Sequence, residues 1–287
     1  MSDTVLKQDL SEQVEYSSLN MLRLLFRKET ELPSHDAIME KLKKHFGNVD
    51  SVSCGKDMQS FALLDYMVTY DNGEQSPAML LITVLPPVQE PIGDAITRTQ
   101  FWNVEGGEEL LDSCSYHIMI SDFMSAGLSA QDRAQILSEW SEIILELYPE
   151  CVAVFSSSSG KLLTAKEARE NPLRGPARFI HFAVNARFFN IEGSDGDYLV
   201  DTLGLYALGC PDVQYHFHTL EPGDIVGHAY DLAIYQLENN IPIEPGNTVA
   251  GFEPELKWVC QYEDSLIQPI REVLDINTGE FSAGNRD

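Results

Sequence analysis

Positive charge is scarce in this sequence. The 287 residues include 19 Lys and Arg against 45 Asp and Glu, which gives a formal net charge of −26 at pH 7. A field of this sign repels nucleic-acid phosphates and anionic lipid head groups, so it argues against direct binding of DNA, RNA or a membrane surface. It favours a basic protein as the partner. The alternative is that the acidic surface serves solubility alone.

Cysteine pairs and long apolar runs are also missing. The five cysteines are odd in number, widely spaced and include no CxxC motif, which predicts reduced, mostly buried thiols rather than disulfides. The most apolar stretch, AMLLITVLPPV (78–88), is too short to span a bilayer. The N-terminal residues lack the basic and apolar regions of a signal peptide. We therefore expect a soluble, cytoplasmic protein.

The familiar catalytic and phosphate-binding motifs do not occur either. The sequence contains no HExxH and no GxSxG. The run FSSSSGKLL has Phe155 and Leu162 where a phosphate loop requires Gly and Ser or Thr. No catalytic residue, no metal site and no cofactor is predicted, and the balance favours a protein that is not an enzyme.

The sequence does carry the hydrophobic patterning of an α+β protein. Helical spacing predicts helices at 34–47, capped by Ser34, and at 128–149, capped by Ser129, with strands between them. We expect mostly antiparallel sheets with helices packed on them, in two or three subdomains. The predicted divisions are a flexible acidic tail (1–17), a β-α-β-β subdomain (18–90), an α-β-α-β subdomain (91–170) and an α+β section (171–287) that opens with strands.

The most chemically suggestive run is CPDVQYHFH, which begins at Cys210. In a strand, His216 and His218 project to the same face, and zinc accepts imidazole, thiolate and carboxylate ligands. A third ligand would have to come from Cys210, Asp212 or His228, and nothing in the sequence brings His228 back toward the strand. Partly buried or solvated strand histidines are the favoured interpretation, and Asp212, His216 and His218 stand as candidate binding residues.

One segment departs from the overall charge. Between Lys161 and Arg187 lie six basic residues and only two acidic ones. Arginine offers forked donors for a carboxylate or phosphate, so an anion pocket or docking site that uses Arg174, Arg178 and Arg187 is one interpretation. Internal contact with acidic groups elsewhere in the chain is the other, and we favour it.

Two runs resemble a known family. DTLGLYALGCPDVQYHFHTLEP (201–222) and WVCQYEDSLIQPIREVLDI (258–276) resemble the C-terminal signature of domain of unknown function 4261, an uncharacterised, largely bacterial family. The resemblance covers about residues 180–277. Its most specific parts are Thr202–Gly204, Gly209, Pro211–Asp212 and Glu263–Ser265. Cys210 stands where an aliphatic residue is expected. The resemblance implies a shared fold and no known reaction.

These features lead to one preferred function and its alternatives. The preferred function is a non-enzymatic intracellular protein-binding module, an immunity or adaptor protein whose acidic surface engages a basic partner. The immunity role is drawn by analogy with families that serve as partners of secreted toxins. The alternative is an enzyme, or a small-molecule or metal sensor, with a pocket around Asp212, His216 and His218. A structural subunit of a homo-oligomer is a third.

Overall fold

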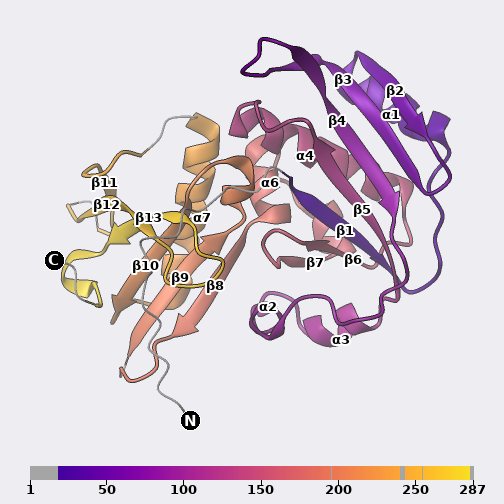
Figure 1. Cartoon of the computed structure of the whole chain (residues 1–287). Coiled ribbons are helices and arrows are strands. Elements are labelled where there is room, and N and C mark those ends of the chain that lie inside the picture. Colours follow the sequence, from indigo (N-terminus) through magenta and orange to yellow (C-terminus); the bar gives the residue numbers. More distant parts are fainter. Residues whose placement is uncertain (1–18, 195, 240–242, 254, 285–287) are drawn as a thin grey trace. The chain divides into compact units, whose positions relative to one another are not determined.

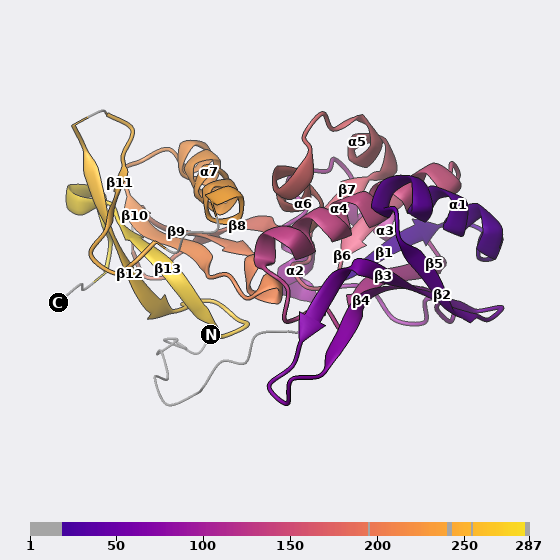
Figure 2. The same cartoon turned by 90° about the horizontal axis from the view of Figure 1, so that it is seen from above.

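The computed structural model describes residues 19–194, 196–239, 243–253 and 255–284, so the predicted tail at 1–17 lies outside the described residues. The described chain forms two compact units, 19–185 and 186–284, called here the N-terminal unit and the C-terminal unit (Figures 1 and 2). Each unit has its own sheet. The predicted α+β class with mostly antiparallel sheets is confirmed.

The N-terminal unit is built on a seven-stranded sheet in the order β2-β3-β4-β5-β1-β6-β7. Every neighbouring pair in it runs antiparallel. The sheet takes strands from both of the first two predicted subdomains. Its elements are β1 (Met21–Phe26), α1 (His35–Phe46), β2 (Val49–Cys54), β3 (Met58–Thr69), β4 (Gln75–Val84), α2 (Ala95–Thr99), α3 (Gly107–Asp112), β5 (Tyr116–Phe123), α4 (Ala130–Leu147), β6 (Ala153–Ser156), β7 (Leu162–Thr164), α5 (Ala165–Glu170) and α6 (Gly175–Ala183).

Helices α1 and α4 cover one face of this sheet (Figure 2). Both begin at the predicted caps: Ser34 Oγ accepts a hydrogen bond from the amide of Ala37, and Ser129 Oγ accepts one from the amide of Asp132. Trp140 of α4 is completely buried, and its ring lies 6.1 Å from that of Phe61 on β3, centroid to centroid. This aromatic contact joins the longest helix of the unit to its sheet.

The opposite face carries a second, smaller core under the short helices α2 and α3. Leu25 of β1 and Phe155 of β6 project to this side and pack with Phe101 and Leu111. Residues 107–112 form α3. The helix is only six residues long, so the sequence offers less than two turns of periodicity to detect it.

The prediction of strands at the start of the third section was wrong for residues 175–183, which form helix α6. Pro176 lies in the first turn, where its missing amide is not needed. Ala177, Ile180 and Ala183 follow at helical spacing and are buried. Aromatic residues such as those of this run are common in strands, but here they are buried equally well on a helix that packs against α4.

The C-terminal unit is built on a six-stranded sheet in the order β11-β12-β13-β10-β9-β8. Strands β10 and β13 run parallel, whereas β9 with β10, β11 with β12, and β12 with β13 run antiparallel. Its elements are β8 (Asn185–Asn190), β9 (Asp197–Leu203), a 3₁₀ turn (Leu205–Leu208), β10 (Asp212–His218), α7 (Pro222–Asn239), β11 (Thr248–Ala250), β12 (Lys257–Asp264), β13 (Glu272–Asn277) and a second 3₁₀ turn (Gly279–Phe281).

Helix α7 covers one face of this second sheet. The residues on its inward side, which include Ile225, Ala229 and Leu237, are buried. They pack on the apolar side of β10 around the completely buried Tyr215. The outer face of α7 is polar, and no helix within the described ranges combines the length and the apolar character needed to cross a bilayer.

The buried Trp140 generates a stability prediction. Replacing Trp140 with Ala leaves a large cavity between α4 and β3, and we expect the free energy of unfolding to fall by about 3–5 kcal/mol. Trp102 is 55% exposed, so Trp102→Ala is the matched control and should change stability by less than about 0.5 kcal/mol. Urea unfolding followed by circular dichroism measures both. Equal losses in the two variants would contradict the assignment of Trp140 as the core anchor.

Candidate functional site

Strand β10 divides the candidate residues between two environments. Successive side chains of a strand point to opposite faces. The odd-numbered side chains of β10 enter the core under α7, and they are Val213, Tyr215 and Phe217. The even-numbered side chains occupy the other face, and they are Asp212, Gln214, His216 and His218. The predicted common face of His216 and His218 follows from this alternation.

Asp212 is completely buried and its carboxylate is fully engaged. One oxygen, Oδ2, accepts a hydrogen bond from Arg271 Nε at 2.8 Å and one from the amide of Gly204 at 3.3 Å. The other, Oδ1, accepts from Thr202 Oγ1 at 3.1 Å and from the amide of Leu205 at 3.0 Å. A carboxylate held by four donors in the protein interior is a structural group, with no oxygen left to contact a ligand.

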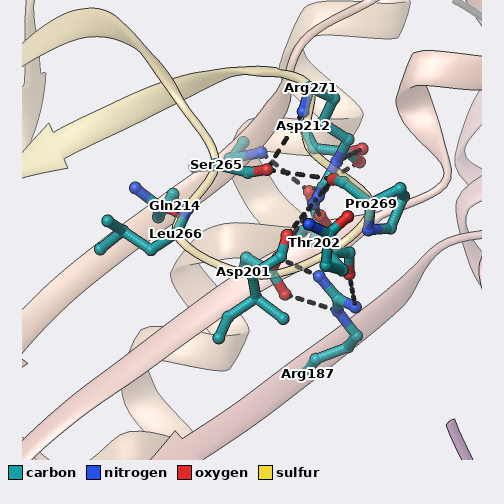
Figure 3. A network of polar contacts seen from close by, with 12 residues as sticks. Arg187, Asp201, Thr202, Asp212, Gln214, Ser265, Leu266, Pro269 and Arg271 are labelled. Atoms are coloured by element: carbon teal, nitrogen blue, oxygen red, sulfur yellow. Dashed lines mark hydrogen bonds and ion pairs between the residues drawn. The ribbon is translucent and has the colours of Figure 1, made fainter. Parts of the chain in front are cut away.

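A second carboxylate extends these contacts into a buried network, defined here as Arg187, Asp201, Asp212 and Arg271 and called the Arg271 network (Figure 3). Asp201 accepts from Arg187 Nε at 2.8 Å and from Arg271 Nη2 at 2.9 Å. Burial alone would lower the pKa of the Arg271 guanidinium. The negative charges of Asp212 and Asp201 have the larger, opposite effect, so the pKa is raised. Two arginines therefore alternate with two aspartates, and each buried charge has an opposite charge beside it.

The loop between β12 and β13 closes over this network. Ser265 Oγ accepts a hydrogen bond from the amide of Arg271 at 3.2 Å and donates one to the carbonyl of Pro269 at 3.0 Å. Arg271 Nη1 also donates to that carbonyl, at 2.9 Å. On the strand side, Gln214 Oε1 accepts from the amide of Leu266 at 2.9 Å. The loop is fastened at both ends by side chains that belong to the polar face of the sheet (Figure 3).

The three histidines of this region do not converge. The C-terminal segment lies over His216: the amide of Ala283 donates to the His216 carbonyl, and a Cβ added at Gly284 would lie 2.9 Å from His216 Nδ1. His218 Nδ1 lies 2.7 Å from Thr219 Oγ1. His228 is on the opposite side of β10, where its Nδ1 lies 2.6 Å from Tyr215 Oη. Among the described residues, no three His, Cys, Asp or Glu side chains are grouped to hold a metal ion.

The basic segment is divided between the two units. Arg174 and Arg178 lie in the N-terminal unit and Arg187 in the C-terminal unit. Arg178 is buried, its Nε lies 2.6 Å from Glu142 Oε1, and its Nη2 donates to the carbonyl of Ala168 at 3.1 Å. Arg174 is exposed and donates to the carbonyl of Leu173 at 2.9 Å. Arg178 Nη1 also donates to the Leu173 carbonyl, so Arg174 and Arg178 lie side by side and line one hollow of about 280 Å³ within the N-terminal unit.

Sequence reasoning missed the outer face of α7. Asp224, Asp231 and Glu238 follow one another at intervals of seven residues, which is close to two helical turns, and all three are exposed. Tyr235 lies on the same stripe and is 47% exposed. We call these four residues the α7 face. The heptad spacing of the three acids was the available signal, but the overall abundance of acidic residues concealed it.

A shallow hollow adjoins the α7 face within the C-terminal unit. It has a volume of about 340 Å³ and is formed between α7 and the edge strand β11. Leu232 and Tyr235 line it from the helix, and Val249 lines it from the strand. His228 of α7 links the two elements, because its Nε2 lies 2.8 Å from the carbonyl of Ala250 at the end of β11. The α7 face therefore combines negative charge with an apolar depression.

Basic residues are few in the C-terminal part of the chain. Residues 186–287 include four basic and eighteen acidic residues. Arg187 and Arg271 are buried in the Arg271 network. Of the basic residues that the structure describes in this unit, Lys257 is the one that is exposed.

The comparisons with known proteins bear on the same unit. The model of a family described as Domain of unknown function (DUF4261) matches residues 201–277, the C-terminal part of the chain. The resemblance predicted from the sequence is thereby confirmed over this range. Three of its most specific parts contain Asp212 of the Arg271 network, Thr202, which donates to Asp212, and Ser265 of the loop that closes the network. Neither a search of curated proteins nor a search of solved structures finds a match.

The Arg271 network generates a second prediction. Replacing Arg271 with Met leaves Asp212 and part of Asp201 without their counter-charge in the protein interior, and we expect a loss of about 3–5 kcal/mol in stability. Lys257→Met removes an exposed positive charge from the same unit and should cost less than about 0.5 kcal/mol. Hydrogen exchange of β10 and β13 amides measures both in the C-terminal unit. Similar protection in the two variants would show that the network does not hold the unit together.

His181 of α6 generates a prediction of pH dependence. Burial, together with the nearby Lys161 and Arg178, lowers the pKa of His181 to about 4, against an ordinary value near 6.5. Between about pH 6.5 and pH 4 the histidine is protonated in the unfolded chain but stays neutral in the folded chain. The free energy of unfolding therefore decreases as the pH falls through this interval. His181→Gln should lose less stability over this interval than the unmodified protein. Urea unfolding at several pH values is the measurement. The exposed His45→Gln is the control, and an unchanged pH slope in His181→Gln would refute the assignment.

Proposed function

We propose that this protein is a non-enzymatic binding module, of the immunity or adaptor type, whose acidic C-terminal unit engages a basic partner protein. One observation carries the proposal: the two arginines that the structure describes in this unit, Arg187 and Arg271, are buried, so among the described residues Lys257 is the one exposed cation that offsets the acidic surface. A surface of one sign raises the rate of encounter with a partner of the opposite sign and rejects partners of like sign.

The α7 face is the part of this surface best suited to contact the partner. Acidic residues alone give long-range attraction but little short-range specificity, because exposed ion pairs contribute only about 0.2–1 kcal/mol each. Tyr235 and the adjoining hollow supply what charge cannot, namely a depression for an apolar side chain of the partner. We infer that the partner presents Lys or Arg residues to Asp231 and Glu238 around one apolar side chain that enters the hollow.

Two of the buried thiols are poorly suited to nucleophilic catalysis. All five cysteines are free, which suits the reducing cytoplasm that we propose as the location. Burial raises the pKa of Cys151 to about 12 and that of Cys260 to about 11. Both thiols therefore stay protonated at neutral pH, and a protonated thiol is a poor nucleophile.

The proposal is tested with short peptides of Lys and Arg around a central Leu, titrated into the full chain by fluorescence anisotropy. The double variant Asp231→Asn/Glu238→Gln should weaken binding by about threefold to tenfold, since two exposed ion pairs are lost. Tyr235→Ala should also weaken it, and replacing the peptide's Leu with Ser should abolish the difference between Tyr235→Ala and the unmodified chain.

A matched control separates the α7 face from the general field of the molecule. Asp50→Asn/Glu105→Gln removes the same charge from two exposed positions of the N-terminal unit, and it should leave peptide affinity within about twofold of the original. If both double variants weaken binding equally, attraction is non-specific and the α7 face is not the docking surface. If neither peptide binds at low salt, the proposed basic partner is refuted.

A further inference from the structure

A cavity of about 600 Å³ lies within the N-terminal unit, on the sheet face that also carries α2 and α3. Arg23 of β1 and Phe155 of β6 are paired residues of neighbouring strands, so their side chains share this face. His117 of β5 is paired with Leu25, two residues beyond Arg23, and it shares the face as well. The proline-rich segment 86–94 forms the opposite wall. The volume is in the range typical of small-molecule sites.

One wall of the cavity is held by a close contact that only glycine allows. Gly160 has a φ of +70°, and a Cβ added there would lie 2.5 Å from Thr97 Cγ2. Glycine therefore lets the serine-rich turn approach α2 at this point. That turn also contributes Ser157, whose hydroxyl accepts a hydrogen bond from Arg23 Nε at 3.0 Å. The serine run FSSSSGKLL, which does not match a phosphate loop, thus holds Arg23 at the cavity through Ser157.

Arg23 differs from every other non-exposed arginine that the structure describes. Arg98, Arg133, Arg178, Arg187 and Arg271 each form an ion pair with at least one carboxylate. Arg23 is half-buried, and within the described chain its one polar contact is the Ser157 hydroxyl. Burial accordingly lowers the pKa of Arg23. A guanidinium taken partly out of water without a counter-ion leaves its two Nη nitrogens available to an anion from solution.

His117 provides a second polar group at the same cavity. Its Nε2 lies 2.8 Å from the carbonyl of Pro86, and a carbonyl can only accept, so Nε2 carries the proton. Nδ1 then holds the lone pair, and it is buried without a hydrogen-bond partner among the described residues, in a side chain that is 8% exposed. Burial lowers the pKa of His117, and the nearby charge of Arg23 lowers it further, although the hydrogen bond to the Pro86 carbonyl acts in the opposite direction. The lowered pKa keeps the ring neutral.

The remaining charges at the cavity narrow the class of ligand. Asp94 caps α2, where its Oδ1 accepts from the amide of Thr97 at 2.7 Å. Glu90 is exposed on the proline-rich wall. The cavity thus offers one forked cation, Arg23, together with carboxylate acceptors on Glu90 and Asp94. A ligand that satisfies both kinds of group is an anion that also carries hydrogen-bond donors.

We propose that this cavity is a binding site for a small hydroxylated anion, whose carboxylate or phosphate group is held by the Nη nitrogens of Arg23 and whose hydroxyl groups donate to the acceptors of the cavity wall. The site lies entirely within the N-terminal unit. It is independent of the α7 face, so either assignment stands if the other fails.

Isothermal titration calorimetry of the full chain tests the site with four probes. Ribose 5-phosphate and gluconate represent the phosphate and carboxylate forms, inorganic phosphate lacks hydroxyl groups on carbon, and ribose lacks the charge. We expect one or both hydroxylated anions to bind, at least about tenfold more tightly than either partial probe. If only one of the two hydroxylated anions binds, the result shows whether the site takes a phosphate or a carboxylate group. Absence of binding by both anions at millimolar concentration, or equal binding of ribose, overturns the proposal.

Variants assign the binding to Arg23. Arg23→Gln should weaken the bound probe by about tenfold or more, because two charge-assisted hydrogen bonds are lost. Arg27→Gln is the matched control: Arg27 also donates from Nε to a serine hydroxyl, that of Ser113, but it is exposed and does not line this cavity. It should leave affinity unchanged, and equal losses in both variants refute the assignment.

A third variant keeps the test decisive if Arg23→Gln does not fold. Glu90→Gln changes an exposed residue on the cavity wall and removes the negative charge that faces the anion. It should tighten binding of the anionic group by about twofold to threefold. An affinity that falls or does not change in Glu90→Gln contradicts the placement of the anion beside this wall.

Discussion

The burial of Arg187 and Arg271 against Asp201 and Asp212 is the constraint on which the C-terminal unit depends. Buried charges are tolerated only when paired, and breaking such a pair is strongly destabilising. Here the pairing joins β8, β9 and β10 to the loop before β13, so it fixes the polar face of the sheet while α7 covers the apolar face. The same contacts withdraw both arginines from the surface. The burial of the two arginines therefore both stabilises the interior of the unit and leaves its surface acidic.

This arrangement explains why the run CPDVQYHFH indicates a fold more than a reaction. Asp212 is consumed by the network, His216 lies under the C-terminal segment, and His228 is directed to Tyr215 on the other side of β10. The residues that carry the family resemblance are those that build the interior. Any specificity for a partner then has to come from the exterior, where the acids and Tyr235 of α7 lie beside a hollow.

The sequence predicted what depends on neighbours along the chain and missed what depends on strand order. The limits of α1 follow from Ser34 and Gly47, and the two faces of β10 follow from simple alternation. The partner of Asp212 is 59 residues away and is reached only because β10 and β13 pair in parallel. Likewise, Arg23, His117 and Phe155 meet because β1 lies between β5 and β6. Neither contact can be predicted from a local sequence pattern. Helix α6 was missed for a different reason, because its aromatic residues suit a strand or a helix equally well.

The two proposals assign opposite chemistry to the two units, an acidic docking face to the C-terminal unit and an anion-binding cavity to the N-terminal unit. The central claim concerns the first of them. Hydrogen exchange of the full chain, recorded while a basic Leu-centred peptide is added at low and at high salt, tests it most directly. The account predicts added protection along α7 and β11 that disappears as salt screens the acids. Protection confined to the N-terminal unit, or protection that salt leaves unchanged, would contradict it.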